Sequence, residues 1–321
     1  MKNRLEELLE RQKVVVLDGA LATELENRGL SLADSLWSAK ILAEQPEEIE
    51  AVHYDYFCAG ADIGISASYQ ATIPGFLSKG YAQQQAEEMI ARSIALLKQA
   101  RARFWAEIGE GAGRAYPVLA ASIGPYGAYL ADGSEYRGEY GLSQQELYAF
   151  HRGRMQDLWE AGAEIFACET IPSLLEAKAL AQCMQEIPGA GGWICFSCKN
   201  GTQICEGTPI AECAAQLEEW DCIQAIGVNC TAPEYVQELI GQIRENSSKP
   251  IVVYPNSGEC YDAVCKTWHG AAEAGGYEAW AKKWYAAGAR LIGGCCRTTP
   301  KDIAAIHRWR CGLEGGQNGR H

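Results

Sequence analysis

The sequence predicts an α/β fold and, within that class, a (β/α)8 TIM barrel. A short apolar segment followed by an amphipathic helical segment occurs eight times, and 321 residues accommodate eight such units with some longer loops. A doubly wound open sheet is the alternative. That sheet usually carries a glycine-rich phosphate-binding turn after its first strand, and residues 18–22 do not form one.

The eight predicted strands are short and continuously apolar, as expected of parallel strands that are covered on both faces. They are 14–17, 61–66, 118–122, 164–168, 193–197, 223–228, 251–254 and 290–293. The helical periodicity between and after them predicts helices near 47–59, 82–106, 144–161, 173–186, 209–220, 232–245, 277–287 and 300–310.

Several of these helices carry start signals. Capping boxes are predicted for Ser143 with Glu146, Ser173 with Glu176, and Thr231 with Glu234, and caps followed by proline for Thr208–Pro209 and Thr299–Pro300, the latter with Asp302. We expect one domain over residues 1–311 and a flexible tail over 312–321, which is glycine-rich and polar.

Composition excludes several classes of protein. The net charge of −13 argues against nucleic acid and anionic membranes as partners. No apolar run approaches the roughly 20 residues of a membrane span. Residues 1–10 are predicted to form a charged amphipathic helix, which is not the pattern of a signal peptide. Without a signal peptide we expect a cytoplasmic protein, in which the 14 cysteines stay reduced and do not form a disulfide framework.

Polar side chains follow every predicted strand at its carboxyl end, where barrel enzymes place their active sites. They are Asp18, Ser66 with Ser68, Ser122, Glu169, Ser197, Asn229 with Cys230, Asn256, and Cys295 with Cys296. This one-sided placement predicts a pocket at that end.

The last of these strand ends carries two adjacent thiols. Side chains of neighbouring residues in a strand point to opposite faces, but Gly293 and Gly294 allow the chain to leave strand geometry before Cys295 and Cys296. Cys230 follows the sixth strand, and only the seventh strand separates the sixth from the eighth. Considered alone, Cys230 would be interpreted as a buried core residue. Together with Cys295 and Cys296 it predicts a site for one Zn²⁺ with an open fourth position.

Three thiolates around Zn²⁺ leave a net charge near −1. Such a site is a poor Lewis acid for splitting water and favours a soft fourth ligand, for which a substrate thiol held as thiolate is suited. The chemistry indicated is therefore alkyl transfer to sulfur. A zinc hydrolase is less favoured, because no histidines show ligand spacing.

Asp18 and Glu169 are predicted to bind a substrate ammonium group; a helix cap and an ion pair are their structural alternatives. The backbone N–H groups of Gly19 and Ala20 are expected to receive a carboxylate. Ser66 and Asn229 are expected to line the substrate site.

Three further residues remain open at this stage. His269 could line the pocket or be structural, Trp37 could form a lid or pack, and Arg297 could orient the cysteine turn or bind a carboxylate. Cys195 and Cys198 should point to opposite faces of a strand, and Cys260 and Cys265 should have no role.

At these residues the sequence resembles the homocysteine S-methyltransferase family, over residues 17 to about 306. The matching segments are 17–25, 34–39, 68–71, 121–127, 168–172, 227–231 and 293–298, the last two being highly specific. The resemblance implies a zinc-binding barrel that methylates L-homocysteine to methionine. It implies Cys230, Cys295 and Cys296 as zinc ligands, and Asp18 and Glu169 as contacts of the homocysteine amino group.

Segments 254–259 and 266–268 look like the stand-alone branch of that family, which uses S-methylmethionine. The chain ends soon after the eighth helix, which disfavours the cobalamin-dependent branch. We therefore expect a zinc-held homocysteine thiolate to attack the methyl group of a sulfonium donor, S-methyl-L-methionine or S-adenosylmethionine. A betaine-type donor and a non-catalytic, thiol-rich zinc-binding protein are the alternatives, and the oligomeric state stays open.

Overall fold

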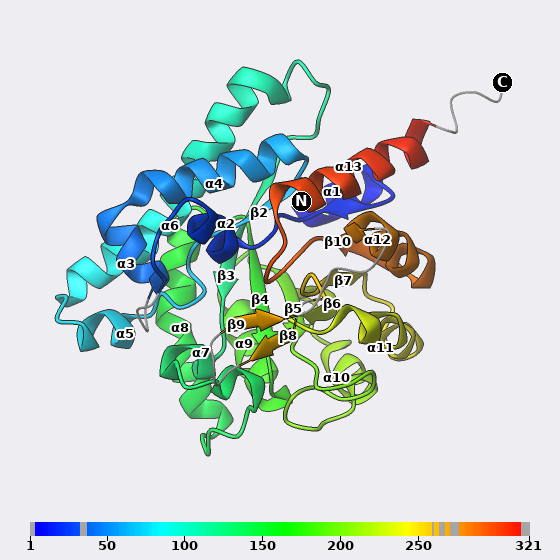
Figure 1. Cartoon of the computed structure of the whole chain (residues 1–321). Coiled ribbons are helices and arrows are strands. Elements are labelled where there is room, and N and C mark those ends of the chain that lie inside the picture. Colours follow the sequence, from blue (N-terminus) through cyan, green and yellow to red (C-terminus); the bar gives the residue numbers. More distant parts are fainter. Residues whose placement is uncertain (1–3, 33–36, 259, 263–266, 270–275, 316–321) are drawn as a thin grey trace.

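The computed structural model describes residues 4–32, 37–258, 260–262, 267–269 and 276–315. Eight parallel strands form a nearly closed barrel with helices between them, which confirms the predicted fold class (Figure 1). The strands are β1 (Val15–Val16), β2 (Ile63–Ile65), β3 (Val118–Ile123), β4 (Ile165–Ile171), β5 (Gly192–Phe196), β6 (Ile223–Asn229), β7 (Ile251–Tyr254) and β10 (Ala289–Ile292). Each lies at a predicted position.

The order of the strands is β1-β10-β7-β6-β5-β4-β3-β2. The two ends of this sheet meet, because Leu17 bridges Ile63 in parallel and the N–H of Asp62 donates to the carbonyl of Val16 at 2.7 Å. This contact between the first two strands excludes the open-sheet alternative. A separate antiparallel hairpin, β8 (Cys260–Asp262) and β9 (Thr267–His269), follows β7 and was not predicted.

The predicted helices surround the barrel (Figure 1). They are α4 (Pro46–Ala59), α6 (Gln83–Phe104), α8 (Gln144–Glu160), α9 (Leu174–Glu186), α10 (Ile210–Leu217), α11 (Pro233–Asn246), α12 (Gly276–Ala287) and α13 (Pro300–Gly315). Helix α13 continues past the predicted end at residue 310. Within the described ranges, no helix is both long and apolar enough to pass through a membrane.

Short elements in the loops were not predicted. They are α2 (Leu21–Asn27), α3 (Trp37–Glu44), α5 (Ile73–Ser78), α7 (Tyr126–Leu130), a π-helical turn (Trp105–Gly109) and a 3-10 turn (Ser134–Tyr136). Except for the π-helical turn, all follow a strand at its carboxyl end and precede the next main helix. They therefore build the rim of the candidate pocket.

The capping predictions were correct in part. The Ser143–Glu146 box is reciprocal, and Thr299 begins α13 with its N–H bonded to Asp302 at 2.9 Å. Ser173 caps α9, but the carboxylate of Glu176 turns inward instead of returning to the cap.

Two caps were wrong. Ala232 and Pro209 occupy the cap positions of α11 and α10. Thr231 and Thr208 lie one residue earlier and bond to the carbonyl of Asn229 and to Glu206. Both hydroxyls therefore stabilise the loops at the barrel mouth and not the helices that follow.

The core has two parts, one inside the barrel and one between the barrel and its helices. The predicted amphipathic N-terminal helix exists as α1 (Arg4–Arg11), and its Leu5 and Leu8 are buried with the inner cluster. Arg290 of β10 secures this end by donating to the carbonyls of Leu9, Gln12 and Lys13. Because α1 closes the amino end of the barrel, the carboxyl end is the open one.

Candidate metal centre and substrate site

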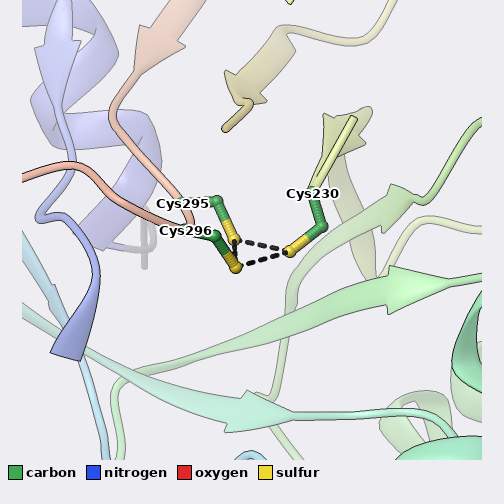
Figure 2. Close-up of side chains that lie close together, drawn as sticks. All are labelled: Cys230, Cys295 and Cys296. Atoms are coloured by element: carbon green, nitrogen blue, oxygen red, sulfur yellow. Dashed lines mark hydrogen bonds between the residues drawn. The ribbon is translucent and has the colours of Figure 1, made fainter. Parts of the chain in front are cut away.

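Three cysteines from two loops meet at the carboxyl end of the barrel. Cys230 follows β6 and Cys295–Cys296 follow β10, and both strands pair with β7 between them. All three sulfur atoms lie within 4.8 Å of one another (Figure 2). Among the described residues, this is the one group of three or more cysteine, histidine or acidic side chains with metal-binding spacing.

The sulfur–sulfur distances fit a metal centre. Cys296 lies 3.8 Å from Cys230 and 3.9 Å from Cys295, close to the roughly 3.8 Å edge of a tetrahedron with Zn–S bonds of about 2.3 Å. The Cys230–Cys295 distance is 2.6 Å, shorter than that edge, so this pair must separate to share an ion. The donor set of three thiols suits Zn²⁺ and leaves one tetrahedral position for another ligand.

The two glycines before Cys295 bring the turn against the first strand. The N–H groups of Gly293, Gly294 and Cys295 donate to the carbonyls of Val253, Asp18 and Pro255 at 2.9–3.1 Å. A Cβ at Gly294 would lie 2.3 Å from the Thr298 hydroxyl oxygen, and one at Gly293 would lie 2.5 Å from Leu17. The glycines are therefore required by close approach of the backbone, as well as by the change of direction.

Backbone strain is concentrated at this site. Four residues other than glycine have positive φ in the described ranges, and three of them are Cys230 (46°), Thr170 (60°) and Arg297 (67°). For non-glycine residues this conformation costs free energy and persists where surrounding bonds hold it. The N–H of Arg297, for example, is held by the Thr23 hydroxyl at 3.1 Å.

The three thiols cannot all ionise easily without a cation. Hydrogen bonds from Cys230 and Cys295 lower the pKa of Cys296 well below its ordinary value. Hydrogen bonding with the other two thiols, followed by burial, raises the pKa of Cys295. The hydrogen bonds within the cluster therefore favour ionisation of Cys296 over Cys295, and a divalent cation would favour ionisation of all three thiols.

The two predicted carboxylates face the same region. Burial raises the pKa of Asp18 well above its ordinary value, although the Ile65 N–H bonds to it at 2.7 Å, and the charge of Glu169 raises it further. Burial raises the pKa of Glu169 to about 7, against a hydrogen bond from Ser122, and the charge of Cys230 adds to the rise. The charge of Glu169 acts on Asp18 and the charge of Cys230 acts on Glu169, so Glu169 connects the first carboxylate to the cysteines electrostatically.

A chain of serines supports Glu169. The Ser66 and Ser68 hydroxyls are 2.7 Å apart, and Ser66 accepts from the Ser122 N–H at 3.1 Å. The Ser122 hydroxyl donates to Glu169. Ser66 is therefore connected to the carboxylate through Ser122, as expected of its strand-end position.

The surroundings of the other predicted residues are as follows. The Ala20 N–H donates to the Thr298 hydroxyl at 3.2 Å, so this N–H is already bonded within the protein. A Cβ at Gly19 would lie 2.9 Å from Thr298 and Tyr56, so close packing requires glycine here, and the carboxylate role of its N–H stays a prediction. Both amide atoms of Asn229 bond to Thr170, at 2.6 and 2.9 Å.

Predictions on the remaining residues have mixed outcomes. Cys195 is buried inside the barrel and Cys198 in the outer core, on opposite sides as predicted. Cys265 lies outside the described residues. Trp37 lies in α3 and His269 in β9, and their side chains are outside the described part of the structure.

Several site residues were missed from sequence. Thr170 bonds to Asn229, the residue before Cys230, through both its N–H and its hydroxyl oxygen. Burial, followed by the charges of Cys195 and Glu169, raises the pKa of Tyr254, whose hydroxyl accepts from Trp193. For Tyr136 of the 3-10 turn, the charge of Cys230 is the main cause that raises the pKa. For Thr170 the position beside Glu169 was a usable signal, whereas Tyr136 lies in a loop whose path the sequence pattern does not indicate.

Comparison with known proteins agrees with this geometry. A family model described as Homocysteine S-methyltransferase matches residues 15–309. Homocysteine S-methyltransferase YbgG of Bacillus subtilis is 53% identical over 312 residues, covering 97% of this chain and 99% of the relative. Homocysteine S-methyltransferase of Escherichia coli is 48% identical over 305 residues, covering 95% and 97%.

A solved structure is also similar. The crystal structure of the homocysteine methyltransferase MmuM from Escherichia coli, in its metallated form, superposes with a TM-score of 0.86 at 44% identity. The match covers 96% of this chain and 100% of that one. The chain therefore belongs to the homocysteine S-methyltransferase family, enzymes that transfer a methyl group to homocysteine.

Proposed function

We propose that the enzyme holds one Zn²⁺ through Cys230, Cys295 and Cys296, and that it methylates L-homocysteine from a sulfonium donor. The observation that carries this proposal is the meeting of three sulfurs within 4.8 Å at the open end of the barrel. The strand ends of the same barrel mouth also carry the buried carboxylate of Asp18 and the partly buried carboxylate of Glu169. When bound, the metal would lower the pKa of the acceptor thiol, so that homocysteine is present as a thiolate at neutral pH.

Asp18 and Glu169 are proposed to bind the homocysteine ammonium group. Both carboxyls have raised pKa values in the free protein, Glu169 to about 7. An ammonium group between them would offset their repulsion and favour the ionised forms. The serine chain from Ser66 through Ser122 would hold Glu169 in place, and Asn229 would contribute by fixing the adjacent backbone.

Methyl transfer then needs little proton transfer from the protein. A bond forms between the homocysteine sulfur and the methyl carbon while the bond from that carbon to the donor sulfur breaks, and its electron pair stays on the donor sulfur. The step joins an anion and a cation, so charge is neutralised in the transition state. The chain's own contribution is positioning and water exclusion, which can supply several kcal/mol, on the order of 7–11 in favourable cases.

S-methyl-L-methionine is the proposed donor, giving two molecules of methionine, with S-adenosylmethionine as a second sulfonium donor. Support comes from the segment Tyr254 to Ser257 after β7, which resembles the stand-alone branch. The net charge of −13 and the anionic site suit a cationic donor. Glycine betaine is a zwitterion, but its methyl groups also lie on a cationic centre, a quaternary ammonium, so a local preference for positive charge does not separate it from a sulfonium.

A donor panel tests the proposal. The purified protein, with its zinc content measured, is incubated with L-homocysteine and S-methyl-L-methionine, S-adenosyl-L-methionine or glycine betaine. We expect about one zinc per chain and the highest rate with S-methyl-L-methionine. A highest rate with betaine would overturn the assignment of the donor. Full activity in zinc-free protein would overturn the proposed role of zinc.

A further inference from the structure

Thr170 is a bonding centre at the barrel mouth that the proposed reaction does not yet use. It is 1% exposed and lies in β4, next to Glu169. Its N–H donates to Asn229 Oδ1 at 2.6 Å, and its Oγ1 accepts from Asn229 Nδ2 at 2.9 Å. We call this pair, with its two hydrogen bonds, the Thr170–Asn229 clamp.

The clamp crosses the barrel above β5, because Asn229 ends β6 and Thr170 lies in β4. The hydroxyl of Ser197, the residue after β5, is 3.5 Å from the Thr170 carbonyl and 3.3 Å from that of Glu135. Side chains of alternate strands point inward in the same layer of a barrel, which explains why β4 and β6 meet here. Asn229 is fully buried, so these bonds form in a low-dielectric environment where they are strong.

The hydroxyl oxygen of Thr170 is engaged by the clamp, because Oγ1 accepts from Asn229 Nδ2. Asn229 is the residue before Cys230, so the clamp links Thr170 to the backbone of one proposed metal ligand. Such outer contacts orient metal ligands and are costly to lose.

The clamp also holds two strained backbones. Thr170 has φ 60° and Cys230, the residue after Asn229, has φ 46°. A β-branched residue rarely adopts this conformation without external bonds. The pairing of β4 with β5 shifts register between Cys168 and Ile171, at the same place.

We propose that the Thr170–Asn229 clamp is a spacer that sets the separation between the Glu169 carboxylate and the Cys230 sulfur, and thereby selects the length of the amino thiol. Glu169 is covalently next to Thr170, and Cys230 is covalently next to Asn229. The two hydrogen bonds are thus a short, rigid link between the group that would bind the ammonium and the group that would fix the acceptor sulfur. This inference rests on the proposed roles of Glu169 and Cys230.

Homocysteine and cysteine differ by one methylene between the ammonium and the sulfur. A rigid spacer matched to the longer molecule would disfavour the shorter one, because cysteine could not reach both groups at once. One methylene typically accounts for roughly 10–200-fold in discrimination. A loosened spacer would weaken homocysteine binding and leave cysteine, which is already mismatched, nearly unchanged.

The test compares Thr170→Val, which keeps the shape but removes the hydroxyl, with Thr170→Ser, which keeps the hydroxyl. The readouts are the KM for L-homocysteine and the inhibition constant for L-cysteine, measured on protein with full metal content. For Thr170→Val we expect the homocysteine KM to rise about tenfold and the cysteine constant to change less than about twofold. Thr170→Ser should restore the wild-type ratio of these two constants.

Thr202→Ala is the matched control, since this exposed threonine bonds locally to Asn200. It should leave both constants unchanged. If Thr170→Val does not fold, Asn229→Ala carries the same test, because it also breaks the clamp. An unchanged ratio, or equal losses for both ligands, would overturn the spacer role. If the wild-type protein binds no metal or transfers no methyl group to homocysteine, the proposed function itself is wrong.

Discussion

Burial at the barrel mouth shifts the protonation of Glu169. Its pKa is about 7, raised from 4.5 first by burial and then by the charge of Cys230. A carboxyl whose pKa rises on folding stabilises the fold while it is protonated. That contribution is complete below about pH 4.5 and is lost as the pH rises through about 7.

Glu169→Gln should therefore separate stability from activity. In metal-free protein at about pH 8, the free energy of unfolding should rise by roughly 1–3 kcal/mol relative to wild type. At about pH 4, where wild-type Glu169 is protonated, the difference should disappear. Denaturant unfolding at both pH values measures this, and equal stabilities at the higher pH would contradict the assigned pKa.

The pH dependence of activity should follow the same group. If ionised Glu169 binds the ammonium, kcat/KM for homocysteine should rise with pH through about 7 in wild type. Glu169→Gln should lose this rise and show a higher homocysteine KM. A variant with an unchanged KM would remove Glu169 from the ammonium site.

A single thiol tests the metal ligands. Cys296→Ala should remove metal binding and turnover together, because two remaining thiols cannot complete the centre. Cys311→Ala is the control, since this thiol is exposed on α13. Elemental analysis and a methionine assay on both variants give the answer, and turnover retained in Cys296→Ala would contradict the assignment.

Among residues, sequence reasoning succeeded where the backbone dictates position. Asp18, Glu169 and the cysteines follow strands, and parallel strands in a barrel end on one side. It did not anticipate that Ala20 bonds to Thr298 and Asn229 to Thr170, because these partners lie in distant segments of the chain. Local pattern carries no information on which of several polar groups will meet.

At the scale of the elements, the turn after β10 allows the most specific prediction, which concerns a side chain at Gly294. Gly294→Ala would bring a Cβ to 2.3 Å from the Thr298 hydroxyl oxygen, and that hydroxyl also holds the Cys295 carbonyl at 2.7 Å. We expect a loss of roughly 1–3 kcal/mol in stability and weaker metal binding. Thermal unfolding and metal titration measure both effects.

Gly153→Ala in α8 is the matched control, because nothing lies within 4 Å of its Cβ. In a helix interior this change should stabilise by roughly 0.5–1 kcal/mol. Metal affinity should stay unchanged. Similar behaviour of the two variants would mean that the turn tolerates a side chain and that its glycines do not position Cys295.

The main strands and helices could be predicted because burial on both faces and helical periodicity leave clear patterns. The short rim helices could not, since segments of five to eight residues such as α5 and α7 show too few periods. Ser173 caps α9 as predicted, and the missing return bond from Glu176 has a specific cause. The Glu176 carboxylate is buried between the Tyr126 N–H at 2.6 Å and His151 at 2.8 Å, and it stabilises the turn after β3 instead of its own helix.

For the whole molecule, metal binding and folding should be coupled. The cysteines are 66 positions apart in the chain (230 to 296) and come together only in the closed barrel. A metal that binds the folded state stabilises it by about 2.7 kcal/mol at 100 times its Kd. A chelator should therefore lower the Tm by several degrees in wild type and leave Cys296→Ala unchanged, as calorimetry would show.

The barrel fold makes the location of the site predictable from the sequence, because the carboxyl ends of all its parallel strands lie at one end. Asp18, Glu169, Cys230 and Cys295 are dispersed over most of the sequence, yet strand order alone assigns them to one end. The paths of the hairpin after β7 and of the loop that carries Tyr136 could not be predicted in this way. These paths depend on contacts with the rim, and the number and order of the strands give no information on such contacts.

X-ray absorption at the zinc edge tests the central claim most directly. The purified enzyme is measured before and after addition of L-homocysteine. We predict three sulfur ligands at about 2.3 Å and one lighter ligand in the free enzyme, and four sulfurs with homocysteine. A shell with fewer than three sulfurs, or one that homocysteine leaves unchanged, would contradict the account.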